Sequence, residues 1–82
     1  MQECISTLIH TINPMNPQQS VSYLASAYFL AQSEMFHAVE NSDIEGVSYW
    51  SHIMQSVYNI AKTRHLAKDM MYAVADMTKY RG

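Results

Sequence analysis

The chain has 82 residues, which is too few for two domains, and we expect residues 1–82 to form a single one. Its one cysteine, Cys4, excludes an internal disulfide and is typical of a reduced thiol in a cytoplasmic protein. A net charge of −2 and a pI near 6.0 argue against the strongly basic domain that most nucleic-acid binders carry.

The charges are unevenly distributed along the chain. All five Lys and Arg residues, but only two of the seven acidic residues, lie in residues 62–82. A signal peptide needs a Lys or Arg before its apolar stretch, and none precedes the first apolar stretch of this chain. The apolar run over 21–31 is shorter than the ~20 residues of a helix that spans a membrane. We therefore expect a cytoplasmic protein with no membrane contact.

The first predicted helix covers residues 2–12. Its apolar side chains recur at helical spacing, at Ile5, Leu8, Ile9 and Ile12. Pro14 ends the helix because the residue before a proline is pushed out of the α region. Asn16 is a favourable N-cap, and Pro17 suits the first position of the next helix, where its missing N–H costs nothing.

The rest of the chain is organised around the predicted helix 17–40. A seam of apolar or small residues runs along it at steps of three and four, at Val21, Leu24, Tyr28, Ala31, Met35 and Ala38. A second stripe lies beside the first, at Ala25, Phe29, Phe36 and Val39. Tyr23 and Leu30 fall outside the main seam, as do Tyr49 and Tyr58 on the next helix, so something must cover apolar groups on both sides.

A short turn over 41–43 predicts that helix 17–40 and the next helix, 43–62, form an antiparallel hairpin. Ser42 and Glu45 match the S-x-x-E capping box, with Ser42 as the N-cap. Gly46 weakens the first helical turn, which indicates a close approach of the two backbones. Trp50 has the largest side chain in the hairpin, and we expect it to anchor the packing.

The apolar pattern weakens at residues 62–65 and resumes in a fourth helix over 64–80. We expect a bend or break there, with Thr63 as a candidate cap for the new helix. Helices 2–12 and 64–80 emerge at the same end of the hairpin, where they can pack on each other. The sequence therefore predicts an all-α fold, in which a helical hairpin with two flanking helices is completed as a dimeric bundle.

One pair of residues has metal-ligand spacing. Glu34 and His37 form an E-x-x-H motif, which on a helix places a carboxylate and an imidazole on one face, as in di-iron bundles. Such sites need two motifs and further carboxylates, so a metal-dependent enzyme is only a remote alternative. The four histidines lie on different predicted helices and none has a positioned catalytic partner, so we expect no enzyme, no bound metal and no cofactor.

Seven Met and six Tyr residues are unusual for this length and suit both irregular cores and adaptable interfaces. We therefore expect a small non-enzymatic protein–protein interaction module that acts as a homodimer, such as an adaptor, inhibitor or accessory regulator. Its size alone suggests a phage or mobile-element type, and its protein partner is unidentified. The expected interface or anchor residues are Tyr28, Met35, Trp50, Met54, Met70 and Met77.

A small nucleic-acid-binding regulator is the alternative function. Its phosphate contacts would come from the basic end of the chain, at Lys62, Arg64, Lys68, Lys79 and Arg81. Arg64 and Lys68 are four residues apart and are expected to share a helical face, with Tyr72 near enough to stack on a base. Without nucleic-acid binding, these basic residues would form a solvated end of the bundle that complements the acidic hairpin turn.

Overall fold

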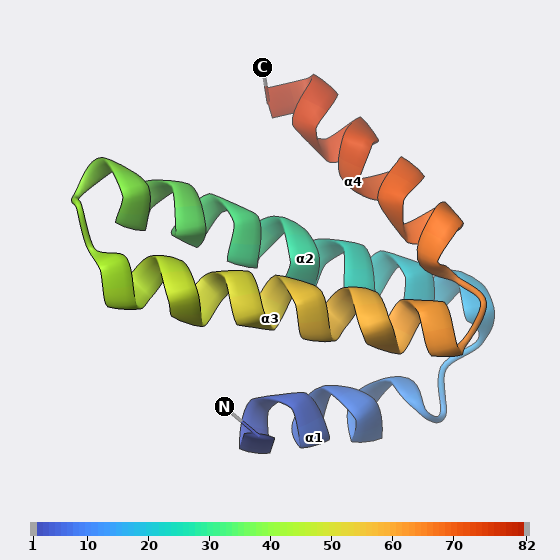
Figure 1. Ribbon diagram of the computed structural model, residues 1–82. Helices are drawn as coiled ribbons and strands as arrows, with labels where there is room; N and C mark the ends of the chain where they lie inside the picture. The colour runs from blue at the N-terminus through green and yellow to red at the C-terminus, as the bar shows by residue number, and fades with distance from the viewer. Residues whose placement is uncertain (1, 82) are drawn as a thin grey trace.

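A computed structural model describes residues 2–81, with side chains described over 6–79. The chain forms four helices in the order α1 (Gln2–Ile12), α2 (Pro17–Glu40), α3 (Ile44–Thr63) and α4 (Ala67–Arg81) (Figure 1). The described residues contain no strand, which confirms the all-α prediction and its four helices. No helix in this part of the chain is long and apolar enough to cross a bilayer.

The α2–α3 hairpin is the centre of the fold (Figure 1). Leu24 and Ala31 of α2 and Val57 and Ala61 of α3 are buried where the two helices meet, and the alanines let the backbones approach closely. The predicted antiparallel hairpin is therefore confirmed. Its start is also as predicted, because the Gln19 N–H donates to Asn16 Oδ1 at 2.8 Å and the Asn16 N–H donates back to Gln19 Oε1 at 3.3 Å.

The N-cap of α3 differs from the prediction by one residue. Asp43 caps the helix, since the Gly46 N–H donates to its Oδ1 at 3.0 Å. Ser42 instead has a φ of 56°, a left-handed conformation that an N-cap does not adopt. The capping box of Ser42 and Glu45 was therefore wrong, because Ser42 is needed to reverse the chain and the cap falls to the next residue.

Gly46 lies where the hairpin is narrow. A Cβ atom placed on it would meet the Asp43 carboxylate and would lie 3.1 Å from Ala38 Cβ on α2. The predicted close approach between the helices exists, and the cap carboxylate adds a second constraint that sequence spacing did not indicate.

The expected break between the last two helices is confirmed, although Thr63 does not cap α4. Thr63 is the last residue of α3, and its Oγ1 donates to the Asn59 carbonyl at 2.8 Å. His65 then takes a φ of 61°, and the Leu66 N–H donates to the Ala61 carbonyl at 2.8 Å. The left-handed residue redirects the chain, and α4 begins at Ala67.

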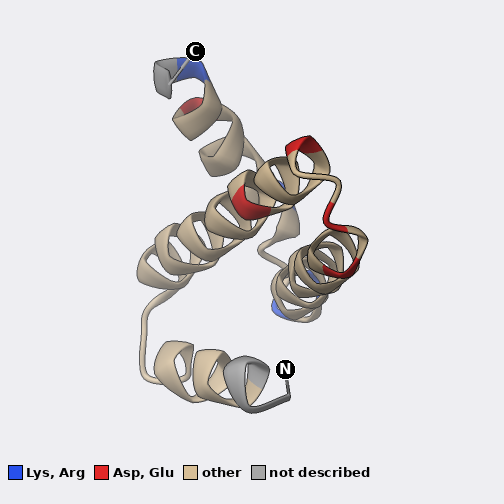
Figure 2. Ribbon diagram, turned by 90° about the vertical axis from the view of Figure 1, so that its left-hand side faces the viewer, with Lys and Arg blue, Asp and Glu red and all other residues tan. Residues whose placement is uncertain are grey.

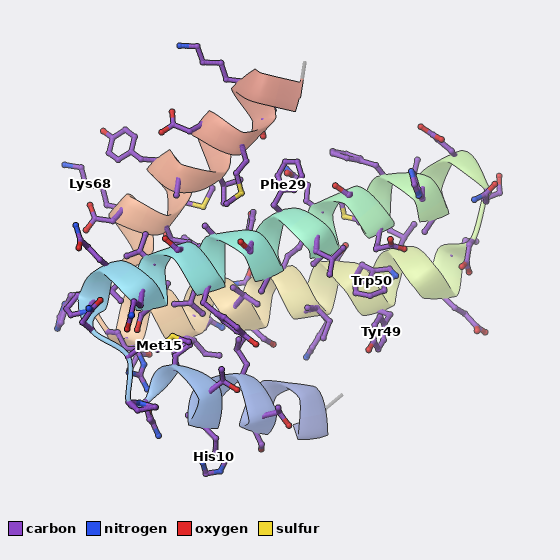
Figure 3. The ribbon with its side chains drawn as sticks, turned by 180° about the vertical axis from the view of Figure 1, so that it is seen from behind. His10, Met15, Phe29, Tyr49, Trp50 and Lys68 are labelled. Carbon is purple, nitrogen blue, oxygen red and sulfur yellow. The ribbon has the colours of Figure 1, made fainter. Side chains whose placement is uncertain are left out.

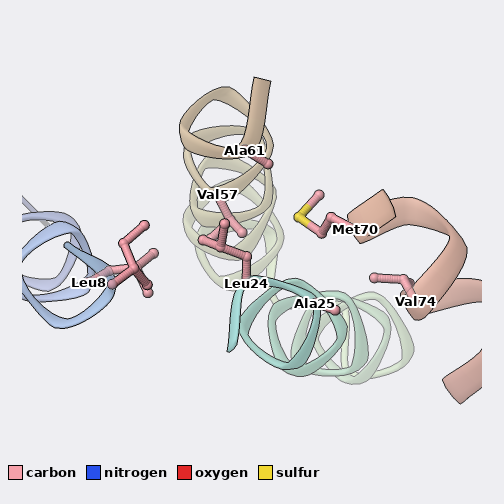
Figure 4. Close-up of a cluster of buried hydrophobic side chains, with 8 residues drawn as sticks. Leu8, Leu24, Ala25, Val57, Ala61, Met70 and Val74 are labelled. Carbon is pink, nitrogen blue, oxygen red and sulfur yellow. The ribbon is translucent and has the colours of Figure 1, made fainter. Parts of the chain in front are cut away.

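Helices α1 and α4 lie on opposite faces of the hairpin (Figures 1 and 4). Leu8 and Ile12 approach from the α1 side, whereas Met70 and Val74 approach Ala25 of α2 from the α4 side. The expectation that α1 and α4 pack on each other was therefore wrong, because the turn at His65 carries α4 across the far face. The Cα trace measures 38 × 31 × 16 Å, so the molecule is a flat stack with a thin core.

The charges separate along the hairpin axis (Figure 2). Glu40, Asp43 and Glu45 surround the turn between α2 and α3, and all are exposed. The described part of the hairpin before Lys62 contains no Lys or Arg.

The dimeric completion of this bundle stays a prediction.

Candidate protein-binding groove

An open groove of about 1540 Å³ separates α1 from the hairpin, and we call it the α1 groove. Met15, in the α1–α2 connector, points into this space (Figure 3). Its apolar lining comes from α1, α2, α3, this connector and the α3–α4 connector, and includes Leu8, Met15, Val21, Tyr23, Ala27, Leu30, Ala31, Trp50, Ile53, Val57 and Leu66. A concave apolar surface of this size is typical of binding sites.

The groove is open because α1 is too short to cover the hairpin. At a rise of ~1.5 Å per residue, α1 is roughly 16 Å long and α2 is roughly 36 Å long. The half of α2 nearest the turn therefore has no neighbour on this side. Leu30, in this half, is 58% exposed as a result, and Tyr23, nearer the start of α2, is 39% exposed. Both residues fall outside the main seam of α2, so the sequence did carry a signal for this surface.

Trp50 is a wall of the groove and is only half-buried. Its ring packs edge-on against Tyr49, with centroids 4.9 Å apart and planes at 89°. The fully buried hairpin residues are instead Leu24, Ala25, Ala31, Val57 and Ala61. Trp50 therefore presents part of a large aromatic surface to the groove, where it can contact a bound molecule.

The polar groups of the groove are few and mostly uncharged. Thr7, Gln18, Gln19, Ser22 and Ser26 supply hydroxyl and amide groups. Asp69 is the one charged side chain among the described lining residues. No buried side-chain nitrogen or oxygen of the described residues lacks a hydrogen-bond partner.

A second apolar surface lies at the turn of the hairpin. It consists of Phe36, Val39 and Ile44, and we call it the tip patch. These side chains are 53%, 55% and 82% exposed. Phe36 and Val39 belong to the second predicted stripe of α2, and α4 diverges from α2 before it reaches them (Figure 1). Sequence periodicity identified which residues form the stripe, but it did not indicate where along α2 the packing of α4 ends.

The six expected interface or anchor residues are divided between core and surface. Met70 is fully buried, and Tyr28 and Met77 are half-buried against the core. Met35, Met54 and Tyr28 line a shallow hollow, where the Ser51 Oγ donates to Met35 Sδ at 3.0 Å. Trp50 alone among the six lines the α1 groove.

The four expected phosphate contacts whose side chains are described are not brought together on one helix face. The Arg64 guanidinium donates to Asn13 Oδ1 and so ties the α1–α2 connector to the end of α3. Lys68 begins the next helix, so the expectation that Arg64 and Lys68 share a face was wrong. Lys62, Lys68 and Lys79 are exposed, with Lys79 roughly 17 Å beyond Lys68 along α4. The Arg81 side chain lies outside the described side chains.

Glu34 and His37, the E-x-x-H pair, lie in the last two turns of α2. Glu34 is half-buried and His37 is exposed. Among the described residues, no group of three or more His, Cys, Asp and Glu side chains lies close enough to hold a metal ion. Within the side chains described over 6–79, no further carboxylates gather with this pair into such a group.

Comparison with known proteins finds no match to this chain among family models, curated protein sequences or solved structures. The site must therefore be interpreted from its own chemistry.

Proposed function

We propose that this protein is a non-enzymatic protein–protein interaction module that acts as a homodimer. The observation that carries the proposal is the exposure of large apolar side chains at two places, the α1 groove and the tip patch. Burying apolar surface stabilises a complex by roughly 25 cal/mol per Å². Soluble monomers rarely expose contiguous apolar patches without an interaction role.

Self-association is supported by the small size of the core. An 82-residue chain buries little more than ~60% of its unfolded surface, so its stability margin is narrow. Ile44 is almost wholly exposed at the turn, and Val39 and Phe36 in the last turns of α2 are more than half exposed. Covering these side chains with a second copy would link folding stability to protein concentration. We assign the tip patch to this role.

The experiment compares solution association of the wild-type chain with a tip variant that carries Phe36→Gln and Val39→Gln. Both residues are more than half exposed, so glutamine removes apolar contact surface without opening a core cavity. We expect the dimer dissociation constant, measured by sedimentation equilibrium, to rise at least tenfold, which is about 1.4 kcal/mol. His52→Gln, on the exposed side of α3 and two turns from Ile44, is the matched control and should leave it unchanged. Equal association of wild type and tip variant would remove the tip patch from the proposal.

A further inference from the structure

The α1 groove combines an apolar floor with a carboxylate in its lining. Asp69 lines it near the start of α4, and no described Lys or Arg lines it anywhere. On α2, Glu34 follows the lining residue Leu30 by four residues, so both side chains lie on one face of the helix. The groove therefore has one carboxylate in its lining at the α4 end and a second one turn beyond its lining toward the hairpin turn.

We propose that the α1 groove binds a cationic amphipathic helix of another protein. Its apolar stripe would pack on Leu30 and Trp50, while Lys or Arg residues flanking the stripe would reach Asp69 at one end and Glu34 at the other. This inference rests on the proposed function and names the kind of partner. The α2 wall of the groove runs from Pro17 to Ala31, which at ~1.5 Å per residue is roughly 21 Å, the length of a helix of about four turns.

The charges favour a foreign helix over a second copy of this chain. The hairpin before Lys62 has no cation to offer a second groove. Helix α4 does carry Lys68 and Lys79, but its apolar residues Met70 and Val74 are already buried against the hairpin, and its exposed large apolar side chains, Met71 and Tyr72, are neighbours within one turn. Among the described residues, a second copy therefore offers no free helix whose apolar stripe is as long as the groove.

Trp50 provides a direct readout because it is the sole tryptophan of the chain and lines the groove. Its fluorescence would be titrated with a synthetic 14-residue peptide of Leu and Lys whose Leu residues form one helical stripe. The first control peptide has the same composition in scrambled order. The second control peptide has Glu in place of every Lys. We expect a saturable blue shift with the cationic amphipathic peptide and at least tenfold weaker binding of both controls. Equal binding of the anionic peptide, or no saturable shift, would overturn the proposal.

Two variants locate the binding to the groove. Leu30→Gln removes a side chain that is more than half exposed, so the core remains packed, and we expect at least tenfold weaker peptide binding. Glu34→Lys should weaken it severalfold at low salt and less at high salt, because salt screens exposed charges beyond about 10 Å at 0.1 M. Ser48→Gln is the control that leaves binding unchanged, and circular dichroism checks that each variant is folded. Unaltered binding by Leu30→Gln would contradict the proposal.

The outcome separates this inference from the homodimer. A dimer whose Trp50 emission ignores the cationic peptide overturns the groove assignment and leaves self-association standing. A monomer that binds the peptide supports the groove assignment and contradicts the homodimer. Trp50 emission that shifts with protein concentration in the absence of peptide would show a second copy in the groove, which overturns the foreign helix.

Discussion

At the scale of single residues, the hairpin turn depends on two neighbours with different backbone roles. Ser42 adopts the left-handed conformation, and Asp43 caps α3. The left-handed region costs a residue with a Cβ atom about 1 kcal/mol or more, and glycine avoids this cost. We expect Ser42→Gly to raise the free energy of unfolding by about 0.5 kcal/mol, after the greater entropy of the unfolded glycine chain is included.

Asp43→Ala should have the opposite effect and lower the free energy of unfolding by about 1 kcal/mol, because the Gly46 N–H loses its acceptor. Urea unfolding followed by circular dichroism measures both changes. A stabilised Asp43→Ala, or a Ser42→Gly that loses more stability than Asp43→Ala, would contradict this assignment of roles.

Gly46 is expected to resist the substitution that normally strengthens a helix. Glycine to alanine inside a helix gains about 1 kcal/mol from propensity alone. Here the new Cβ would displace the Asp43 carboxylate and press on Ala38, so we expect Gly46→Ala to lower the free energy of unfolding by about 1 kcal/mol.

A double-mutant cycle with Asp43→Ala isolates the cause of this loss. Removing the carboxylate first should reduce the cost of Gly46→Ala by at least half. Costs that add independently would assign the loss to Ala38 alone.

At the scale of elements, one hydrogen bond joins the segment before α2 to the end of α3, at the end of the hairpin opposite the turn. The Arg64 guanidinium reaches Asn13 Oδ1 across 51 positions of sequence and fixes the α1–α2 connector to the end of α3. Because the pair is largely solvent-accessible, we expect Arg64→Ala to cost about 1 kcal/mol, with a similar loss for Asn13→Ala.

The two losses should not add in the double variant, which would leave a coupling of about 1 kcal/mol in denaturant unfolding. Fully additive losses would mean that Arg64 does not hold the connector in solution.

The helices themselves follow closely from local sequence signals. Asn16 and Pro17 fix the start of α2, and the weakened pattern near residue 63 indicates the end of α3. The cap of α3 was misplaced because Ser42 and Asp43 are both good capping residues, and only the backbone conformation of Ser42 decides between them. Periodicity reports which side chains share a face and not the dihedral angle of a turn.

At the scale of the whole molecule, the arrangement of α1 and α4 required the structure. Their exit from the same end of the hairpin is implied by helix order, but the left-handed His65 sends α4 to the opposite face. The α1 groove follows from this arrangement, because α1 alone is left to cover one side. The sequence indicated part of the α1 groove, because Tyr23 and Leu30 fall outside the main seam of α2. It did not indicate the exposure of Ile44 in the tip patch.

The two apolar surfaces differ in shape and so suit different uses. The tip patch is a small group of side chains at a turn, surrounded by carboxylates, and its proposed use is contact with a second copy. The α1 groove is a long trough with Trp50 in its wall, and its proposed use is to hold a helix. A small chain with a thin core thus exposes large apolar side chains at two places.

The central claim is that exposed apolar surface on this chain serves association. The most direct test is the solution mass of the wild-type chain, measured by light scattering after size exclusion at micromolar concentration. We expect twice the 9.4 kDa of one chain, falling toward the monomer mass on dilution. A mass of 9.4 kDa at every concentration up to the millimolar range would contradict the homodimer.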